Sequence, residues 1–222
     1  MDRKDMNSDY FDDVLVRMAY HSSAMDGNTI SLPETVSIIL EGSIITAGHS
    51  VREFYEIDNH RQAFAYMLDL VEEKSILSVK DVERFHSLLM DRLQCAQMKS
   101  QLYQNIIYGT NSRRVMSEET SFLLEEWIKD VNFYLKRHGD PIQVIAESHI
   151  QFEKMHPFNS GNGRVGRLMN MFLAISVIKV PILIMKDVKA VYMKCLIEED
   201  VEGLTAILRD SIDYERIRMM QF

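Results

Sequence analysis

Residues 156–167, here called the motif segment, gather side chains and glycines suited to phosphate chemistry. Three of the chain's nine glycines lie in this segment, and its two arginines stand three residues apart. Glycine lets a ligand approach the backbone closely, and the N–H groups at the start of a helix attract anions. Arginines in the first turns oppose the helix dipole unless an anion balances them. The segment therefore predicts a phosphate-binding site at the start of a helix.

A histidine lies directly before this predicted anion site. His156 opens the motif segment, five residues ahead of Gly161. Histidine exchanges protons near neutral pH and serves most often as the general base of enzymes. A proton acceptor beside a phosphate site favours phosphoryl or nucleotidyl transfer to a hydroxyl group. The plainer interpretation, a loop histidine without chemistry, is outweighed by the glycines and arginines that accompany it.

The elements that must position the motif segment are helices. Nine glycines and four prolines in 222 residues make about half of the usual share, which favours helices. Helical spacing of apolar residues and helix-capping signals predict helices over residues 11–25, 31–42, 54–71, 78–89, 124–135, 140–152 and 164–178. The fold class that we expect is therefore all-α.

Residues 101–116 break this helical periodicity. Residues 106–108 are typical of a strand, and residues 109–112 have the composition of a turn. This pattern predicts one short β-hairpin, exposed as a flap on the helical bundle.

The glycines also match the dinucleotide-binding pattern G-x-G-x-x-G over residues 161–166, with Asp187 about 20 residues later. That pattern requires a strand that runs directly into the glycines. The preceding residues 140–152 instead have the periodicity of a helix. A dinucleotide-binding fold is therefore the disfavoured alternative.

Composition limits the partners of the chain. The formal net charge of −8 argues against a general electrostatic hold on DNA, although one local basic pocket is compatible with it. The most apolar stretch, residues 168–185, contains Asn170, Lys179 and Pro181, which a membrane span rarely tolerates. The N-terminal stretch lacks the apolar segment of a signal peptide. We therefore expect a cytoplasmic protein that binds neither DNA nor membranes.

The motif segment resembles the signature of the Fic family, H-x-F-x-[D/E]-G-N-G-R-x-x-R, at every fixed position but one. Residues 56–60, 103–115 and 192–208 resemble further parts of that family, so the resemblance covers most of the chain. It implies a Fic-like helical bundle. It also implies AMPylation, which is the transfer of AMP from ATP to a serine, threonine or tyrosine hydroxyl of a target protein or of the chain itself.

The resemblance implies roles for two groups that face the target protein. His156 would be the general base that deprotonates the target hydroxyl. The flap, with Gly109, Thr110 and Val115, would align the target peptide through main-chain pairing, as in strand addition.

The resemblance also implies an ATP site. Its residues would be Phe158, Gly161, Asn162, Gly163, Arg164 and Arg167. Phe158 would anchor the loop in the core, and residues 161–163 would surround the α- and β-phosphates with support from Arg164. Arg167 would bind the γ-phosphate.

Ser160 is the one departure from the signature, where the family has an acidic residue that helps hold magnesium. A hydroxyl is a poorer ligand for Mg²⁺ than a carboxylate, so we expect Ser160 to be a weak metal ligand and ATP phosphates to hold the ion. Ser160 could also be the N-cap of the following helix. Two alternatives stay open: a nucleotide-binding regulatory module with weak or lost catalysis, and a kinase or de-AMPylating enzyme on the same site.

Residues 22–28 resemble the family's inhibitory motif, [S/T]-x-x-x-E-[G/N], with Asp26 in place of glutamate. Ser22 and Asp26 stand one turn apart, and an aspartate in the last turn of a helix costs about 0.3–1 kcal/mol unless a cation compensates. The resemblance supplies Arg167 as that cation, which would exclude the γ-phosphate. A plain turn after the helix is the alternative.

This second resemblance predicts a division of the chain. We expect residues 1–50 to be an N-terminal inhibitory portion and residues 51–222 to be the Fic-like catalytic core. The sequence leaves open whether the inhibition acts within one chain or between the subunits of a homo-oligomer.

Overall fold

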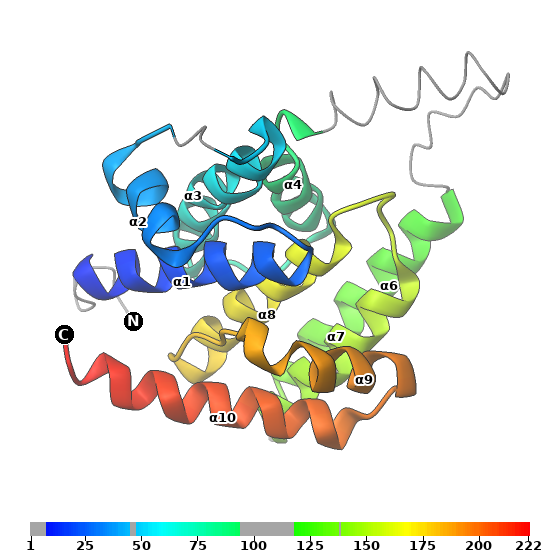
Figure 1. Ribbon diagram of the computed structural model, residues 1–222. Coiled ribbons are helices and arrows are strands. Elements are labelled where there is room, and N and C mark those ends of the chain that lie inside the picture. The colour runs from blue at the N-terminus through cyan, green and yellow to red at the C-terminus, as the bar shows by residue number, and fades with distance from the viewer. Residues whose placement is uncertain (1–7, 45–47, 94–117, 138) are drawn as a thin grey trace, which may run out of the picture.

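The computed structural model describes residues 8–44, 48–93, 118–137 and 139–222. Every regular element in these ranges is a helix, which confirms the all-α prediction (Figure 1). The elements are α1 (Ser8–Met25), α2 (Leu32–Glu41), α3 (Val51–Glu72), α4 (Val79–Leu89), α6 (Glu118–Leu135), α7 (Pro141–Met155), α8 (Asn162–Ile178), the 3-10 helix η1 (Lys186–Val188), α9 (Lys189–Glu198) and α10 (Val201–Met219). The predicted hairpin, with Gly109, Thr110 and Val115, lies outside the described residues.

Local sequence signals set several helix boundaries. Ser50 and Ser78 begin α3 and α4 as N-caps, and both form capping boxes with the residue three positions later. Such boxes satisfy backbone N–H groups that a helix start leaves unpaired. α2 ends at Gly42 in the left-handed conformation, with φ at 68°. The predicted start at Ser78 and the predicted stop at Gly42 are confirmed.

Helix α8 lies at the centre of the bundle, in contact with α1, α3, α4 and α7 (Figure 1). Every residue from Arg164 to Ile175 is buried. A helix buried on all sides is normally apolar around its whole circumference, yet the first turns of α8 carry two arginines. Removing a charge from water costs several kcal/mol unless it is paired. The partners of Arg164 and Arg167 must therefore compensate for the cost of burying their charges.

Helix α1 joins two parts of the core. Val14 and Met18 pack into the main core, whereas Val16 and Ala19 pack into a second, smaller core with residues of α2 and α3. Apolar burial thus places α1 firmly between α3 and α8. The turn directly after its last residue, Met25, contains Asp26, and the position of this turn follows from that placement.

A buried cluster of charged groups, here called the α1–α10 ion cluster, fixes α1 from the opposite side. The carboxylate of Glu215, which is 0% exposed, accepts hydrogen bonds from Arg17 at 2.9 Å and from the Tyr10 hydroxyl at 2.8 Å. Asp13 in turn accepts hydrogen bonds from Arg17 and Arg218. The contacts between α1 and α10 join residues that are about 200 positions apart in the chain.

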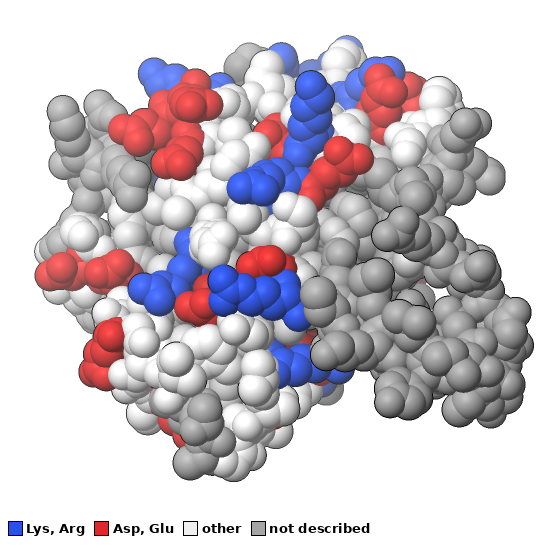
Figure 2. All heavy atoms as spheres, turned by 90° about the horizontal axis from the view of Figure 1, so that it is seen from above, with Lys and Arg blue, Asp and Glu red and all other residues white. Residues whose placement is uncertain are grey.

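Charged side chains of both signs are interspersed over the described part of the face in Figure 2. The described part of this face therefore has no large area of a single charge sign. Among the helices of the described ranges, none has the length and apolar character needed to span a membrane.

Candidate active site

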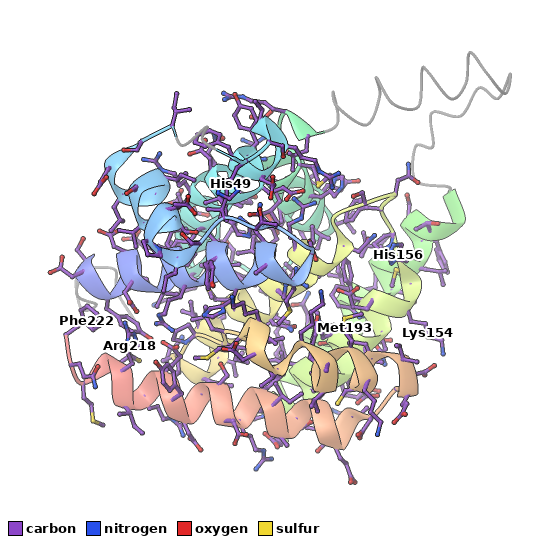
Figure 3. The ribbon with its side chains drawn as sticks, in the orientation of Figure 1. His49, Lys154, His156, Met193, Arg218 and Phe222 are labelled. Atoms are coloured by element: carbon purple, nitrogen blue, oxygen red, sulfur yellow. The ribbon has the colours of Figure 1, made fainter. Side chains whose placement is uncertain are left out.

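His156 lies where α7 ends. It is the C-cap residue of that helix, and its backbone N–H donates to the Phe152 carbonyl at 3.0 Å. Its φ of 49° is left-handed, a conformation that costs a residue with a Cβ roughly 1 kcal/mol or more. Strain of this kind often accompanies functional sites. The turn leaves His156 exposed where the chain enters the loop to α8 (Figure 3).

The loop between α7 and α8 is closed by the side chain of Asn162. Asn162 Oδ1 accepts from the Phe158 N–H at 2.9 Å, and Asn162 Nδ2 donates to the Phe158 carbonyl at 2.6 Å. Phe158 itself is buried in the main core. The amide of Asn162 therefore holds the loop in shape, so only its backbone N–H is left to face an anion.

His86 supports the same loop, although no signal in the sequence indicates this role. Its ring stacks on Phe158, with the ring centroids 3.9 Å apart and the planes 8° apart. Its Nε2 lies 3.1 Å from the Ser160 carbonyl, which can only accept, so Nε2 carries a proton. Burial lowers the pKa of His86, and the bond to Ser160 only partly offsets that effect. His86 precedes Ser160 by 74 positions, and no local pattern predicts their contact.

The N-terminus of α8 is formed by glycine. Its N-cap is Gly161, with φ at 84°, and no side chain caps the helix, so the expectation that Ser160 is the N-cap is wrong. Left-handed backbone at position 161 favours glycine, and a Cβ there would lie 2.6 Å from Met90 Sδ. A Cβ on Gly163 would lie 2.8 Å from Arg167 Nη1. The two glycines thus leave room for the loop and for the arginine.

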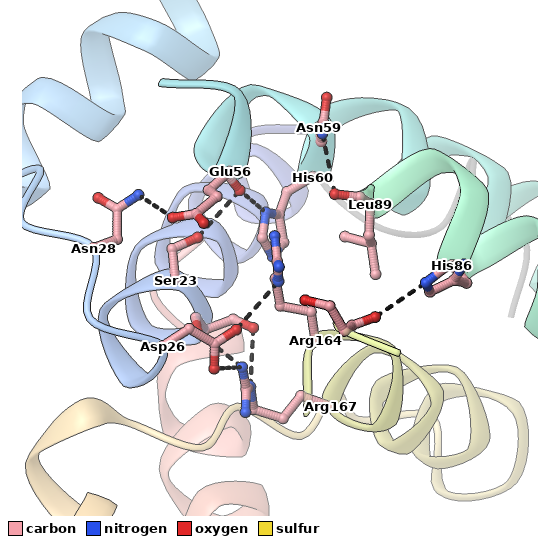
Figure 4. A network of polar contacts seen from close by, with 12 residues as sticks. Ser23, Asp26, Asn28, Glu56, Asn59, His60, His86, Leu89, Arg164 and Arg167 are labelled. Atoms are coloured by element: carbon pink, nitrogen blue, oxygen red, sulfur yellow. Dashed lines mark hydrogen bonds and ion pairs between the residues drawn. The ribbon is translucent and has the colours of Figure 1, made fainter. Parts of the chain in front are cut away.

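Arg167 is bound by the end of α1 (Figure 4). Its Nε donates to Ser22 Oγ at 2.9 Å, and its Nη2 donates to the Ser22 carbonyl at 2.9 Å and to Asp26 Oδ1 at 3.1 Å. Burial alone would lower the pKa of Arg167, but Asp26 and other acidic neighbours raise it above its usual value. The structure therefore brings Ser22, Asp26 and Arg167 together in one chain.

Asp26 also faces the second arginine. Its Oδ2 lies 3.2 Å from Arg164 Nε, but without the geometry of a hydrogen bond. Nε and Nη1 of Arg164 are buried and have no hydrogen-bond partner among the described residues. Burial lowers the pKa of Arg164, although Asp26 and Glu56 oppose that effect. One aspartate is thus shared by two buried guanidiniums.

The segment that carries Asp26 is tied to α3. Gly27 ends α1 with φ at 94°. Asn28 Nδ2 then donates to the Glu53 carbonyl at 2.9 Å and to Glu56 Oε2 at 3.1 Å, while Ser23 Oγ donates to the Glu56 carbonyl (Figure 4). These bonds fix the turn around Asp26 independently of its two arginine contacts.

His149 and Trp127 are core residues with buried polar contacts. His149 Nε2 lies 2.8 Å from the Tyr192 hydroxyl, and Trp127 Nε1 donates to the Ser148 carbonyl at 3.1 Å. In the described ranges, no three His, Cys, Asp or Glu side chains are grouped so that they could hold a metal ion.

The Fic/DOC family model matches residues 76–174, a stretch that includes α4, α7, the loop and most of α8. The chain therefore carries a Fic/DOC family domain. Together with the helical fold, this finding excludes the dinucleotide-binding alternative for the motif segment.

Curated relatives agree with this assignment. Protein adenylyltransferase fic-1 of Caenorhabditis elegans is 26% identical over 196 residues, which cover 86% of this chain and 37% of that protein. Protein adenylyltransferase Fic of Aedes aegypti is 27% identical over 179 residues, which cover 78% and 34%. The chain thus spans a little over a third of the length of these relatives.

Solved structures share the fold. A fragment of Fic-1 from C. elegans has a TM-score of 0.73 at 20% sequence identity and covers 95% of this chain and 63% of that one. A Fic domain containing signalling protein from Bacteroides thetaiotaomicron has a TM-score of 0.71 at 18% identity, covering 96% and 86%.

Proposed function

We propose that this chain is a self-inhibited protein adenylyltransferase, which moves AMP from ATP to a hydroxyl side chain of a target protein or of itself. Curated relatives that match most of the chain bear the name protein adenylyltransferase. The observation that carries the proposal is the pair Arg164 and Arg167, buried at the uncapped start of α8 and sharing one aspartate.

The residues at the start of α8 fit a polyphosphate. Arg164 is 3% exposed, yet two of its nitrogens have no hydrogen-bond acceptor among the described residues. A phosphate supplies several strong acceptor oxygens, and the N-terminus of a helix favours negative charge. An incoming phosphate would therefore satisfy groups that the protein itself leaves unsatisfied.

In the proposed complex, the backbone N–H groups of residues 161–163 and the Arg164 guanidinium bind the α- and β-phosphates. Arg167 binds the γ-phosphate. Phe158, stacked on His86, holds the loop that presents these groups. Position 160 offers a hydroxyl where a carboxylate would serve magnesium better, so Mg²⁺ would be held mainly by ATP oxygens.

The reaction requires one base and one displacement. His156 accepts the proton of the target hydroxyl, and the oxygen then attacks the α-phosphorus of ATP. The bond from that phosphorus to the bridging oxygen breaks, and pyrophosphate leaves while AMP stays on the target. A well-placed general base contributes about a hundredfold or more to the rate. Gly109, Thr110 and Val115 of the predicted flap are proposed to align the target.

The same geometry supports inhibition within one chain. Arg167 cannot bind the γ-phosphate while its N–H groups are bonded to Ser22 and Asp26. We therefore place the inhibitory portion in residues 1–50 and the catalytic core in residues 51–222. The cytoplasmic setting and assembly into a homo-oligomer stay predictions from the sequence.

Ser160 favours a second candidate, a nucleotide-binding regulatory module, because it removes the acidic ligand that the family signature contains at that position. This candidate shares the ATP site and the inhibitory contact with the first. It differs only in the chemical step.

Labelled ATP separates the candidates. The wild type, Asp26→Gly and Asp26→Gly with His156→Ala are incubated with ATP labelled at the α- or the γ-phosphate, with and without magnesium. We expect protein-bound α-label that is strongest for Asp26→Gly and absent after His156→Ala. Protein-bound γ-label would show a kinase instead, and ATP binding without label on protein would favour the regulatory module.

A further inference from the structure

Arg167 has a second set of contacts, which does not involve α1. Its guanidinium lies beside the hydroxyl of Tyr192 in α9: the interaction with Tyr192 raises the pKa of Arg167, and the interaction with Arg167 lowers the pKa of Tyr192 against the rise that burial causes. That hydroxyl lies 2.8 Å from Nε2 of His149 in α7. Arg167, Tyr192 and His149 are 7%, 1% and 2% exposed. Three helices thus contribute one buried polar chain that ends on the arginine.

The Tyr192 hydroxyl stands between a cation and an imidazole. A guanidinium can only donate, so the Tyr192 oxygen faces Arg167 as an acceptor, whereas His149 Nε2 accepts from or donates to the same hydroxyl according to its tautomer. Burial, and next the charge of Arg167, lower the pKa of His149 to about 3. The imidazole is therefore neutral over the physiological pH range, and its Nε2 pairs with the Tyr192 hydroxyl.

Close packing fixes His149. α7 and α8 meet at Gly166, where a Cβ would lie 2.7 Å from His149 Cε1 and 2.8 Å from Glu153 Oε1. The His149 and Tyr192 rings lie 5.8 Å apart and are nearly parallel, at 26°. Because glycine brings the α8 backbone this close, the imidazole has no space in which to turn, and the phenol that it binds is fixed as well.

The two sets of Arg167 partners differ in one respect. Ser22 and Asp26 lie at the end of α1, and their bonds to Arg167 must break before a γ-phosphate can bind there. Tyr192 and His149 lie in α9 and α7, so their bonds persist when α1 withdraws. An arginine without a partner would otherwise sample many rotamers, and ordering them would weaken phosphate binding.

We propose that Tyr192, oriented by His149, is a positioning residue that keeps the Arg167 guanidinium directed at the γ-phosphate once Asp26 has withdrawn. This inference rests on the proposed function, because it requires Arg167 to bind the γ-phosphate. It adds to that function a structural source of preference for ATP over ADP.

The test measures that preference by calorimetry. Every variant carries Asp26→Gly, and the dissociation constants for ATP and ADP are measured with magnesium in excess. The ratio of the ADP constant to the ATP constant reports the γ-phosphate contact. We expect Tyr192→Phe to lower this ratio about tenfold, as for the loss of a hydrogen bond to a charged group. ADP affinity should change by less than about twofold, since the other phosphate contacts are unaffected.

Three further variants control the experiment. Tyr66→Phe removes the Tyr66 hydroxyl, which donates to Asp81 at 2.7 Å, and should leave the ratio unchanged. His149→Gln keeps a hydrogen-bond partner for Tyr192 and should preserve the ratio, whereas His149→Leu should lower it as Tyr192→Phe does.

The inference is overturned if Tyr192→Phe leaves the ratio unchanged or weakens ADP as much as ATP. An equal weakening of ADP and ATP would show that Tyr192 has a merely structural role. If Asp26→Gly alone binds neither nucleotide, the proposed function itself fails, which is a distinct result.

Discussion

Asp26 is one methylene shorter than the glutamate of the family motif that residues 22–28 resemble, yet it reaches both arginines. Asp26 lies 3.1 Å from Arg167 Nη2 and 3.2 Å from Arg164 Nε. The turn at Gly27 and the bonds from Asn28 to α3 place the carboxylate close enough. Backbone position thus compensates for side-chain length, a result that the motif alone does not predict.

The first prediction concerns Asp26→Asn. The substitution removes the carboxylate that the two buried guanidiniums share, so we expect the free energy of unfolding to fall by about 1–3 kcal/mol. Added ATP should restore more stability to this variant than to the wild type, because the ligand replaces the lost charge. Thermal melts with and without ATP measure both effects. Asp58→Asn, which removes a partner of Arg61, is the control and should be near neutral. Equal ATP stabilisation of variant and wild type would argue against a shared site.

The second prediction concerns His86, which supports the loop by a ring stack and one hydrogen bond. His86→Phe keeps the stack and removes the bond to the Ser160 carbonyl. We expect AMP transfer in the Asp26→Gly background to fall by about tenfold, because small displacements at an active site are costly. The free energy of unfolding should change by about 1 kcal/mol. His49→Phe, away from the loop, should leave transfer unchanged, and undiminished transfer by His86→Phe would remove His86 from the site.

At the scale of elements, the sequence shows local signals at helix ends but does not show contacts between residues that are far apart in the chain. Capping residues such as Ser78 and Gly42 act within a few positions, so the sequence shows them directly. The α1–α10 ion cluster does not show in the sequence. Asp13 and Arg17 have the spacing of an ordinary pair on a helix surface, and nothing local indicates that Glu215 joins them.

The third prediction tests that cluster through Glu215→Gln. Removing this charge leaves Arg17 buried with Asp13 as its remaining acid, so we expect the free energy of unfolding to fall by about 2–4 kcal/mol. Chemical denaturation measures the loss. Asp213→Asn removes an exposed pair with Arg216 in the same helix and should cost at most about 0.5 kcal/mol. Similar losses in the two variants would mean that the cluster does not hold α1.

At the scale of the whole molecule, the residues of the candidate site were easier to predict from the sequence than the residues that hold them in place. His156, the glycines and the arginines lie in one short run, and Ser22 and Asp26 in another, so each could be recognised locally. Only the folded structure shows that these two runs come together at Arg167. His86, Tyr192 and His149 act across separate helices, and the role of Asn162 in closing the loop depends on backbone geometry. The flap lies outside the described residues, so its role stays a prediction.

The fourth prediction concerns pH. Burial raises the pKa of Glu153 from 4.5 to about 7, although Arg167 opposes that effect. The folded state then binds more protons than the unfolded state between these values, so stability falls as pH rises through this range. Glu153→Gln stays neutral. It should therefore match the wild type near pH 4.5 and exceed it by roughly 3 kcal/mol at pH 8.

Denaturation at several pH values checks this difference. Taking the difference between variant and wild type cancels the titration of other groups, such as the buried histidines. Glu126→Gln, on an exposed side chain paired with Lys129, should show no pH-dependent difference. A Glu153→Gln difference that is constant from pH 4.5 to 8 would contradict the assignment.

The central claim is that Asp26 and the phosphates of ATP compete for Arg167 and Arg164. Calorimetric titration of ATP into the wild type, Asp26→Gly, Arg167→Ala and the double variant tests it most directly. We predict that Asp26→Gly binds ATP at least about tenfold more tightly than the wild type, a gain of about 1.4 kcal/mol. That gain should disappear when Arg167 is also alanine. Equal affinity of the wild type and Asp26→Gly, or a gain that survives the loss of Arg167, would contradict the account.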